Sequence, residues 1–193
     1  MICQICKIQE ATEHIKVLDQ EYNLCGWDAL KVKDFVHNSI HNFSVNIAWG
    51  SGRIDWGNWY NIRNFLRKYE IKEVLEFGSG LSSELFVIEG IKLTSFDELE
   101  VHVNVMNKLI PIKDNAIFHY YPHNTIPNVK EVYPNRKWDF IFVDGPHWRE
   151  REVKLAMELS NRFICLHDPN LGEQEFFPGV EWKEVASRIY ERI

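Results

Sequence analysis

The residues whose types and spacing could bind a ligand begin in the segment Glu76-Phe77-Gly78-Ser79-Gly80. Glu76 is a carboxylate inside an apolar run, where a charge is costly unless donors or a cation meet it. Gly78 and Gly80 allow backbone conformations that other residues avoid and leave no side chain between the backbone and a ligand. Ser82 can supply a hydroxyl at the start of a helix, where polar or anionic groups are readily bound. The segment therefore predicts a strand, a glycine turn and a helix around a polar ligand.

Acidic residues also end the later segments that have the composition of buried strands. They are Asp97 with Glu98, Asp144 and Asp168. The first pair follows the glycines by about twenty residues, where dinucleotide-binding proteins place a carboxylate on the ribose hydroxyls. Because ligands bind beyond the carboxyl ends of parallel strands, we expect these acids to line one crevice.

The elements that must position these residues alternate along the chain. Strands are expected at 74–77, 92–96, 116–120, 138–143 and 163–167, and helices at 56–66, 81–89, 101–109, 149–159 and 182–193. Alternating strands and helices predict an α/β fold with a doubly wound, mostly parallel sheet. The residues after the fifth strand are too few for another helix and two strands, so we expect a shortened C-terminal part. The fifth strand would then be an edge, covered by the N-terminal 50 residues or by a second subunit.

The N-terminal part differs in character from the remainder of the chain. The loop-like segment 49–53 separates an expected N-terminal extension at 1–52, with one or two helices, from a domain at 53–193. Cys3 and Cys6 form a C-x-x-C pair of the kind used in zinc sites. Since no matching second pair follows, ordinary thiols are the favoured interpretation.

Composition narrows the functional classes. The formal charge of −6 at pH 7 gives no electrostatic argument for binding nucleic acid. No apolar run approaches the roughly 18 residues that cross a bilayer, so no membrane partner is expected. The N-terminus lacks the features of a signal peptide, and four cysteines do not make a disulfide framework. The cytoplasm is therefore the expected location.

The three motifs in this order resemble those of the class I S-adenosylmethionine-dependent methyltransferases, over about residues 57–170. Glu76 to Gly80 is similar to their first motif, Asp97 to the acid that closes their second strand, and 140–144 to their fourth-strand motif. The resemblance implies S-adenosylmethionine as cofactor, with Glu76 near its amino group and Asp97 or Glu98 on its ribose. The implied cofactor-binding residues are Glu76, Phe77, Gly78, Ser79, Gly80, Ser82, Asp97, Glu98 and Asp144.

The implied activity is in-line methyl transfer to a small molecule, with oxygen ahead of nitrogen as the acceptor atom. Asp144 and His147 lie where they could remove the acceptor's proton, although His147 could equally order its own loop. Similarity to the metal-dependent catechol-type O-methyltransferases adds a Mg²⁺ site formed by Asp144, Asp168 and Asn170. In this chain Pro169 separates Asp168 from Asn170, whereas the acid and the amide are adjacent in those enzymes.

Two other classes stay open. A nicotinamide-dependent oxidoreductase would normally carry a third glycine where this chain has Ser83. A non-catalytic nucleotide-binding or partner protein on the same fold would bind the cofactor without turnover. The sequence does not name the methyl acceptor.

Overall fold

The computed structural model describes residues 13–17, 20–24, 56–110, 115–123, 125–144, 149–167 and 181–193. Its helices are α2 (Trp56–Lys68), α3 (Leu81–Ile88), α4 (Glu100–Leu109), α5 (Val129–Val132) and α6 (Arg149–Leu159). The main sheet contains β3 (Glu73–Phe77), β4 (Lys92–Asp97), β5 (Ala116–Tyr120), β6 (Trp138–Val143), β7 (Ser160–Leu166), β8 (Trp182–Ala186) and β9 (Ile189–Arg192). None of the described helices is long and apolar enough to cross a membrane.

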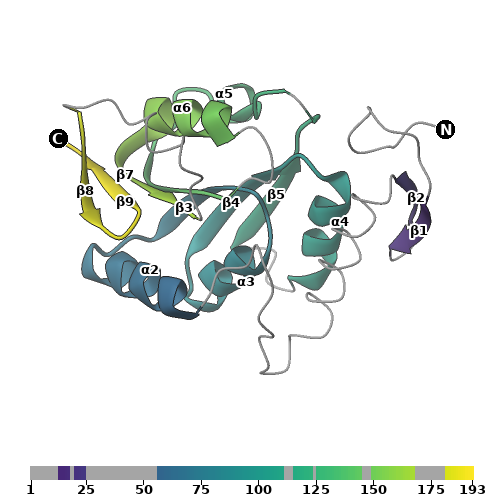
Figure 1. The fold of residues 1–193 in the computed structure, drawn as a ribbon, viewed down its shortest axis with the longest axis horizontal. Helices are drawn as coiled ribbons and strands as arrows, with labels where there is room; N and C mark the ends of the chain where they lie inside the picture. The colour runs from purple at the N-terminus through teal and green to yellow at the C-terminus, as the bar shows by residue number, and fades with distance from the viewer. Residues whose placement is uncertain are drawn as a thin grey trace.

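The centre of the fold is a seven-stranded sheet in the order β5-β4-β3-β6-β7-β9-β8 (Figure 1). β3 pairs in parallel with both β4 and β6, and the parallel pairing continues outward to β5 and β7. The central strands are mostly apolar because both faces of a parallel sheet are covered. These strands and the intervening helices confirm the predicted doubly wound α/β fold.

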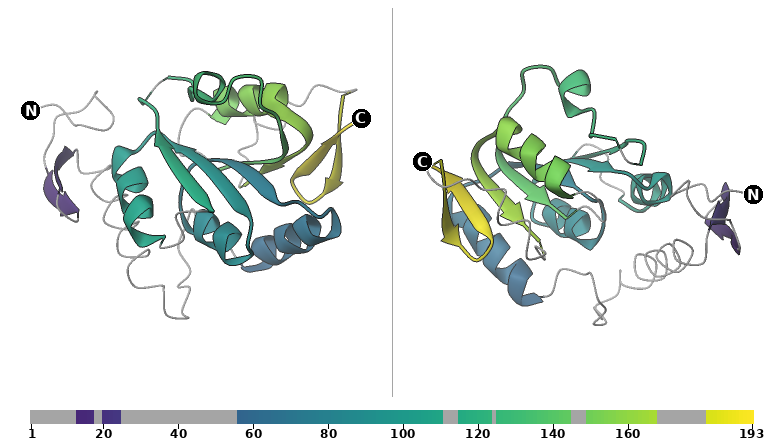
Figure 2. Two further views of the ribbon diagram at one scale, coloured as in Figure 1. Left: turned by 180° about the vertical axis from the view of Figure 1, so that it is seen from behind. Right: turned by 45° about the horizontal axis from the view of Figure 1, so that its top comes forward.

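Helices cover both faces of this sheet, as the two views in Figure 2 show. Alternate residues of β6 divide between two cores, so that Phe140 and Phe142 pack on the side of α2 and α3. Ile141 and Val143 pack with α6 on the opposite side. Since successive side chains of a strand point to opposite faces, one strand supplies both cores. The carboxyl ends of the strands are thereby held rigidly between two packed layers.

The C-terminal segment differs from the prediction, because residues 182–193 form the hairpin β8–β9 and not an amphipathic helix. The spacing of Trp182, Val185, Ile189 and Ile193 mimics a helical stripe, yet only Trp182 and Ile189 are buried. The segment is rich in β-branched and aromatic residues, which favour strands. The chain reverses with Arg188 at a φ of 62°.

This hairpin also changes the expectation for the fifth strand of the parallel series. β9 pairs antiparallel with β7, so β7 is not an edge of the sheet. The prediction that this strand is an exposed edge was wrong, because two strands fit where we expected only a helix. The reason for expecting a homo-oligomer at this edge no longer applies.

The described part of the N-terminal extension consists of β1 (Glu13–Val17) and β2 (Gln20–Leu24), which pair antiparallel in a separate sheet. These residues are therefore strands, where we predicted helix. Cys3, Cys6 and the predicted boundary at 49–53 lie outside the described residues. The division into 1–52 and 53–193 stays a prediction.

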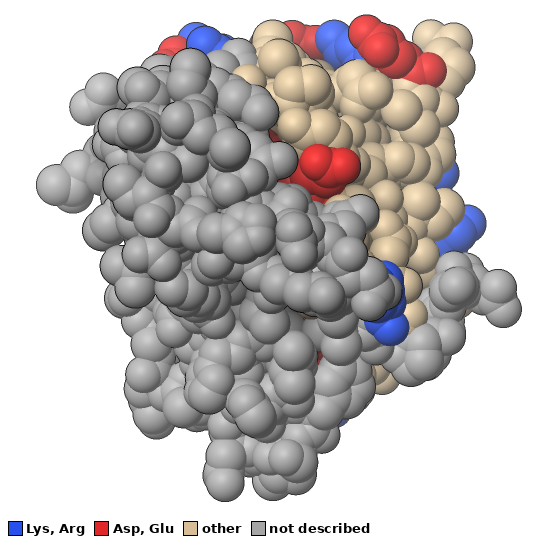
Figure 3. Space-filling view, turned by 90° about the vertical axis from the view of Figure 1, so that its right-hand side faces the viewer, with Lys and Arg blue, Asp and Glu red and all other residues tan. Residues whose placement is uncertain are grey.

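Figure 3 shows charged side chains on the described part of one face of the molecule. The lysine, arginine and acidic side chains that the structure describes there form small separate groups. Binding of a nucleic-acid backbone needs a basic patch or stripe. The described part of this face does not offer one.

Candidate functional site

The glycine loop leaves the sheet at the carboxyl end of β3, between β4 and β6. Gly78 has a φ of 93°, in the left-handed region that glycine favours. Its N–H donates to the carbonyl oxygen of Phe96 at 2.8 Å, and the N–H of Asp144 donates to that of Phe77 at 2.7 Å. The loop is therefore fixed to both neighbouring strands before α3 begins.

Glu76 is fully buried beneath this loop and accepts hydrogen bonds on both carboxylate oxygens. The hydroxyl of Ser82 donates to Oε1 at 2.6 Å, and that of Ser83 donates to Oε2 at 2.5 Å. The Gly80 N–H donates in turn to the Ser83 hydroxyl at 3.0 Å. Two serines at the start of α3 thus supply the donors that a buried carboxylate requires.

The environment of Glu76 favours its neutral form. Burial and, to a smaller extent, the nearby charge of Asp144 raise the pKa of Glu76, the serine hydroxyls lower it, and the net result is a pKa of about 8. A cationic group placed beside Glu76 would reverse this effect, because an opposite charge stabilises the ionised carboxylate. Glu76 is therefore suited to receive the ammonium group of a ligand.

Asp97, at the end of β4, ties the glycine loop to the neighbouring strand. Its Oδ2 accepts from the backbone N–H of Ser79 at 2.7 Å and from the Ser79 hydroxyl at 2.8 Å. Its Oδ1 accepts from the N–H of Leu99 at 2.7 Å, and His102 Nδ1 lies 3.2 Å from Oδ2. Burial alone would raise the pKa of Asp97, but His102 and these donors bring it below its usual value. The carboxylate is therefore ionised and anchors the loop, and its contact with a ribose stays a prediction.

Two further acidic residues contact side chains that follow β5. Glu98 Oε2 lies 3.0 Å from His123 Nδ1, and the buried Tyr121 hydroxyl donates to Glu152 of α6. Burial, and then the charges of Glu152, Glu98 and Asp97, raises the pKa of Tyr121 well above its usual range. Sequence reasoning missed Tyr121, His123 and Glu152. The available signal was that the first two directly follow the strand at 116–120.

Asp144 and His167 meet at the carboxyl ends of β6 and β7. Asp144 Oδ1 lies 2.8 Å from His167 Nδ1. His167 is buried against the ring of Phe142, whereas the Asp144 side chain is 18% exposed. We did not predict His167 as a site residue, although it ends the strand expected at 163–167. The pair holds the Asp144 carboxylate in a fixed orientation beside the loop of Glu76.

Open space adjoins the loop at Gly80. A Cβ built on this residue would meet no atom within 4 Å, and its φ of −176° is extended backbone that any residue adopts. Nothing in the described protein therefore requires glycine here. The backbone at Gly80 is therefore open to the approach of another group.

Other predicted site residues are not placed. His147, Asp168 and Asn170 lie outside the described residues, so their catalytic and metal-binding roles stay predictions. Among the residues that the structure does describe, no group of His, Cys, Asp or Glu could hold a metal ion. Cys165 is a buried thiol within β7, whose pKa burial raises above its usual range.

No protein-family model matches this sequence, and no curated protein matches it. Solved structures, however, share its fold. A Klebsiella pneumoniae protein assigned as an O-methyltransferase has a TM-score of 0.60 at 12% identity, covering 84% of this chain and 89% of that one. The Bacillus cereus O-methyltransferase in complex with SAH has a TM-score of 0.54 at 14% identity, covering 71% of this chain and 65% of that one. This chain has the class I methyltransferase fold.

A third structure with the class I methyltransferase fold is a Staphylococcus aureus protein assigned as a caffeoyl-CoA O-methyltransferase. Its TM-score is 0.54 at 15% identity, and the match covers 70% of this chain and 65% of that one. The chain thus spans somewhat less than two thirds of the Staphylococcus and Bacillus proteins. Identities this low establish the shared fold, whereas activity must be argued from the site.

Proposed function

We propose that this chain is an S-adenosylmethionine-dependent methyltransferase that acts on a small molecule, with oxygen ahead of nitrogen as the acceptor atom. The observation that carries the proposal is the buried Glu76 carboxylate beneath a glycine loop with open space at Gly80. The fold supports it, since the Bacillus cereus neighbour is an O-methyltransferase crystallised with SAH. When bound, S-adenosylmethionine supplies an electrophilic methyl group and a thioether leaving group.

The glycine loop and its surroundings would hold the cofactor. Glu76 faces the ammonium group, and the backbone at Gly78 and Gly80 approaches the ligand without a side chain between them. Asp97 or Glu98 receives the ribose hydroxyls. The acidic character of these strand ends suits a ligand with a positively charged sulfur and amine, because carboxylates stabilise nearby cations.

Asp144 would act on the acceptor, together with His147. A positioned carboxylate or imidazole can take the acceptor's proton as the new bond to carbon forms. His167 holds Oδ1 of Asp144 at 2.8 Å, so that the carboxylate enters the reaction already oriented. His167 is thus a positioning residue in this account.

The proposed Mg²⁺ site finds no ligand set among the described residues. Of Asp144, Asp168 and Asn170, only Asp144 is described, and its Oδ1 is engaged by His167. The Mg²⁺ site therefore stays a prediction.

A second candidate function is cofactor binding without turnover. An oxidoreductase is less consistent with the loop. Ser83 stands where the third glycine belongs, and its hydroxyl is committed to Glu76.

Transfer of a labelled methyl group from S-adenosylmethionine to a panel of phenols, alcohols and amines tests the proposal. We expect methylation of at least one hydroxyl compound, and Asp144→Asn should lower its rate by about a hundredfold or more. The variant should still bind S-adenosylhomocysteine as the wild type does. Full activity in Asp144→Asn would remove Asp144 from the catalytic group, and binding without transfer to any acceptor would favour the second candidate.

A further inference from the structure

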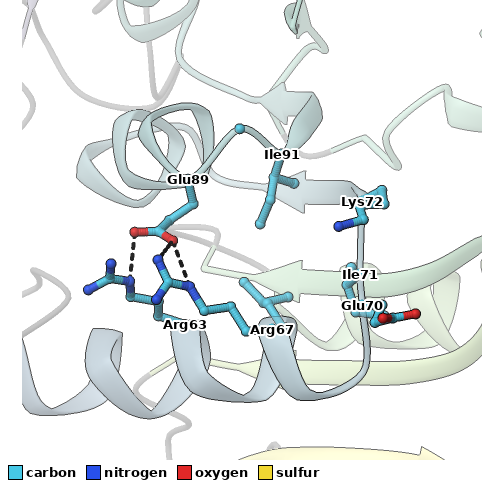
Figure 4. A pocket seen from close by; sticks show the side chains of 9 residues that line it. Arg63, Arg67, Glu70, Ile71, Lys72, Glu89 and Ile91 are labelled. Carbon is cyan, nitrogen blue, oxygen red and sulfur yellow. Dashed lines mark hydrogen bonds and ion pairs between the residues drawn. The ribbon is translucent and has the colours of Figure 1, made fainter.

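A cavity of about 260 Å³ lies at the amino ends of β3 and β4 (Figure 4). The glycine loop lies at the opposite, carboxyl ends of these strands. It is enclosed by the C-terminal half of α2, the turn into β3 and the turn from α3 into β4. Because the length of the strands lies between the two, this cavity is separate from the proposed cofactor site.

The floor of the cavity is apolar. Leu66, Ile71 and Ile91 line it and belong to the buried core. At its side, Gly90 has a φ of 77°, and a Cβ built there would meet no atom within 4 Å. The cavity therefore opens over the turn and offers an apolar surface to part of a ligand.

The rim of the cavity carries an excess of positive charge. Arg63 Nε lies 2.7 Å from Glu89 Oε1, and Arg67 Nη2 lies 2.7 Å from Glu89 Oε2. Arg67 Nε also donates to the same Oε2 at 3.1 Å. Two guanidinium groups thus share one carboxylate, and one positive charge is left uncompensated.

Lys72 adds a further cation to this rim. Its ammonium lies on the cavity side in Figure 4, whereas the carboxylate of Glu70 points away. No described carboxylate forms an ion pair with Lys72. Three cations and two carboxylates therefore line the cavity, which leaves one net positive charge in a chain whose formal net charge is −6.

The excess of positive charge continues along the amino ends of these strands. Glu73 is shared by Lys92 at 3.1 Å and Arg136 at 2.6 Å. The carboxyl ends of the strands carry the acids Glu76, Asp97, Glu98 and Asp144. Positive charge thus gathers at the amino ends of the strands and negative charge at their carboxyl ends. A diffusing anion would be attracted to the amino ends.

We infer that this cavity binds a small organic anion, whose carboxylate or phosphate group lies between Arg67 and Lys72 and whose apolar part rests on Leu66, Ile71 and Ile91. Its volume falls just below the range of about 300–1,000 Å³ typical of ligand pockets, so the ligand is small. Arginine and lysine are the side chains that recognise carboxylate and phosphate groups. The inference is independent of the proposed function at the glycine loop.

Calorimetric titration at constant ionic strength with phenyl phosphate, benzoate and inorganic phosphate tests this inference, since salt screens exposed charges. We expect saturable binding of phenyl phosphate or benzoate, with the better of the two defining the anionic group, and weaker binding of inorganic phosphate, which lacks an apolar part. Lys72→Ala and Lys72→Glu should each weaken binding by about tenfold or more. Lys183→Ala, which removes an exposed cation on β8, should leave it unchanged.

Two controls separate this site from others. Thermal melting of each variant reports whether it is folded, and titration with S-adenosylhomocysteine should give the same affinity in Lys72→Ala as in the wild type. Equal binding of the organic anions to wild type, Lys72→Ala and Lys72→Glu would overturn the inference. Absence of saturable binding to the folded wild type would overturn it equally.

Discussion

Glu76 is the residue on which the chemistry of the glycine loop depends. Its two oxygens receive the hydroxyls of Ser82 and Ser83, and its burial raises its pKa to about 8. A carboxyl group that keeps its proton at neutral pH can change its charge when a ligand cation arrives. This property connects the packing of β3 and α3 to the binding of a cationic ligand.

The raised pKa of Glu76 predicts a specific dependence of stability on pH. The folded protein holds this proton up to about pH 8, whereas the unfolded chain loses it near the ordinary value of 4.5, so stability falls as pH rises through this window. Glu76→Gln removes the titration. Between about pH 5 and pH 8 the wild type should lose on the order of 3 kcal/mol more unfolding free energy than the variant, as urea titrations would measure. Parallel pH profiles would show that Glu76 is not held protonated.

Substitution of Gly80 by alanine adds a single methyl group and tests whether the cofactor lies beside this residue. Gly80→Ala should leave the melting temperature unchanged, because its backbone is extended and the new Cβ meets no protein atom. Affinity for S-adenosylhomocysteine should fall by about tenfold or more if the ligand fills that space, which corresponds to about 1.4 kcal/mol. Gly78→Ala, at a φ of 93°, should instead destabilise the fold. Unchanged affinity in a folded Gly80→Ala protein would place the ligand elsewhere.

The acids of the site could be predicted from sequence, but most of their partners could not. Glu76, Asp97 and Asp144 each lie at or next to the carboxyl end of a strand, and that position alone brings them to one side of a parallel sheet. Ser83 and His167 become partners only through the orientation of side chains from different elements. Such contacts leave no periodic signal in the sequence.

At the scale of elements, prediction succeeded where burial is complete. The central parallel strands are mostly apolar and buried on both faces, and the helices between them carry apolar residues three to four apart. The strand and helix patterns can therefore both be recognised in the sequence. Residues 182–193 gave a misleading signal, since apolar residues three to four apart fit a helix although half of that stripe is exposed. A short hairpin at the end of a sheet offers too few residues to distinguish the two periods.

A matched pair of substitutions tests the hairpin. Ile189 is 1% exposed and packs in the core beside β7, whereas Ile193 is 79% exposed. Ile189→Ala should cost about 2 to 5 kcal/mol of unfolding free energy, and Ile193→Ala should cost less than about 0.5 kcal/mol. Urea-induced unfolding of the two variants measures both values. Equal losses would indicate a helical stripe that contains both residues.

At the scale of the whole molecule, the two ends of the parallel strands differ in charge. Acids gather where the glycine loop leaves β3, and cations gather around the cavity between α2 and the turn into β4. Parallel strands make this possible because all of their carboxyl ends lie on one side. We therefore propose that the carboxyl ends of the strands receive a cationic cofactor and that their amino ends receive an anion.

Calorimetric titration of the folded protein with S-adenosylhomocysteine, with NAD as control, tests the central claim most directly. We predict micromolar binding of the sulfur nucleotide, no comparable binding of NAD, and weaker binding in Gly80→Ala. Failure of S-adenosylhomocysteine and S-adenosylmethionine to bind the folded wild type would contradict the assignment of a cofactor site at the glycine loop.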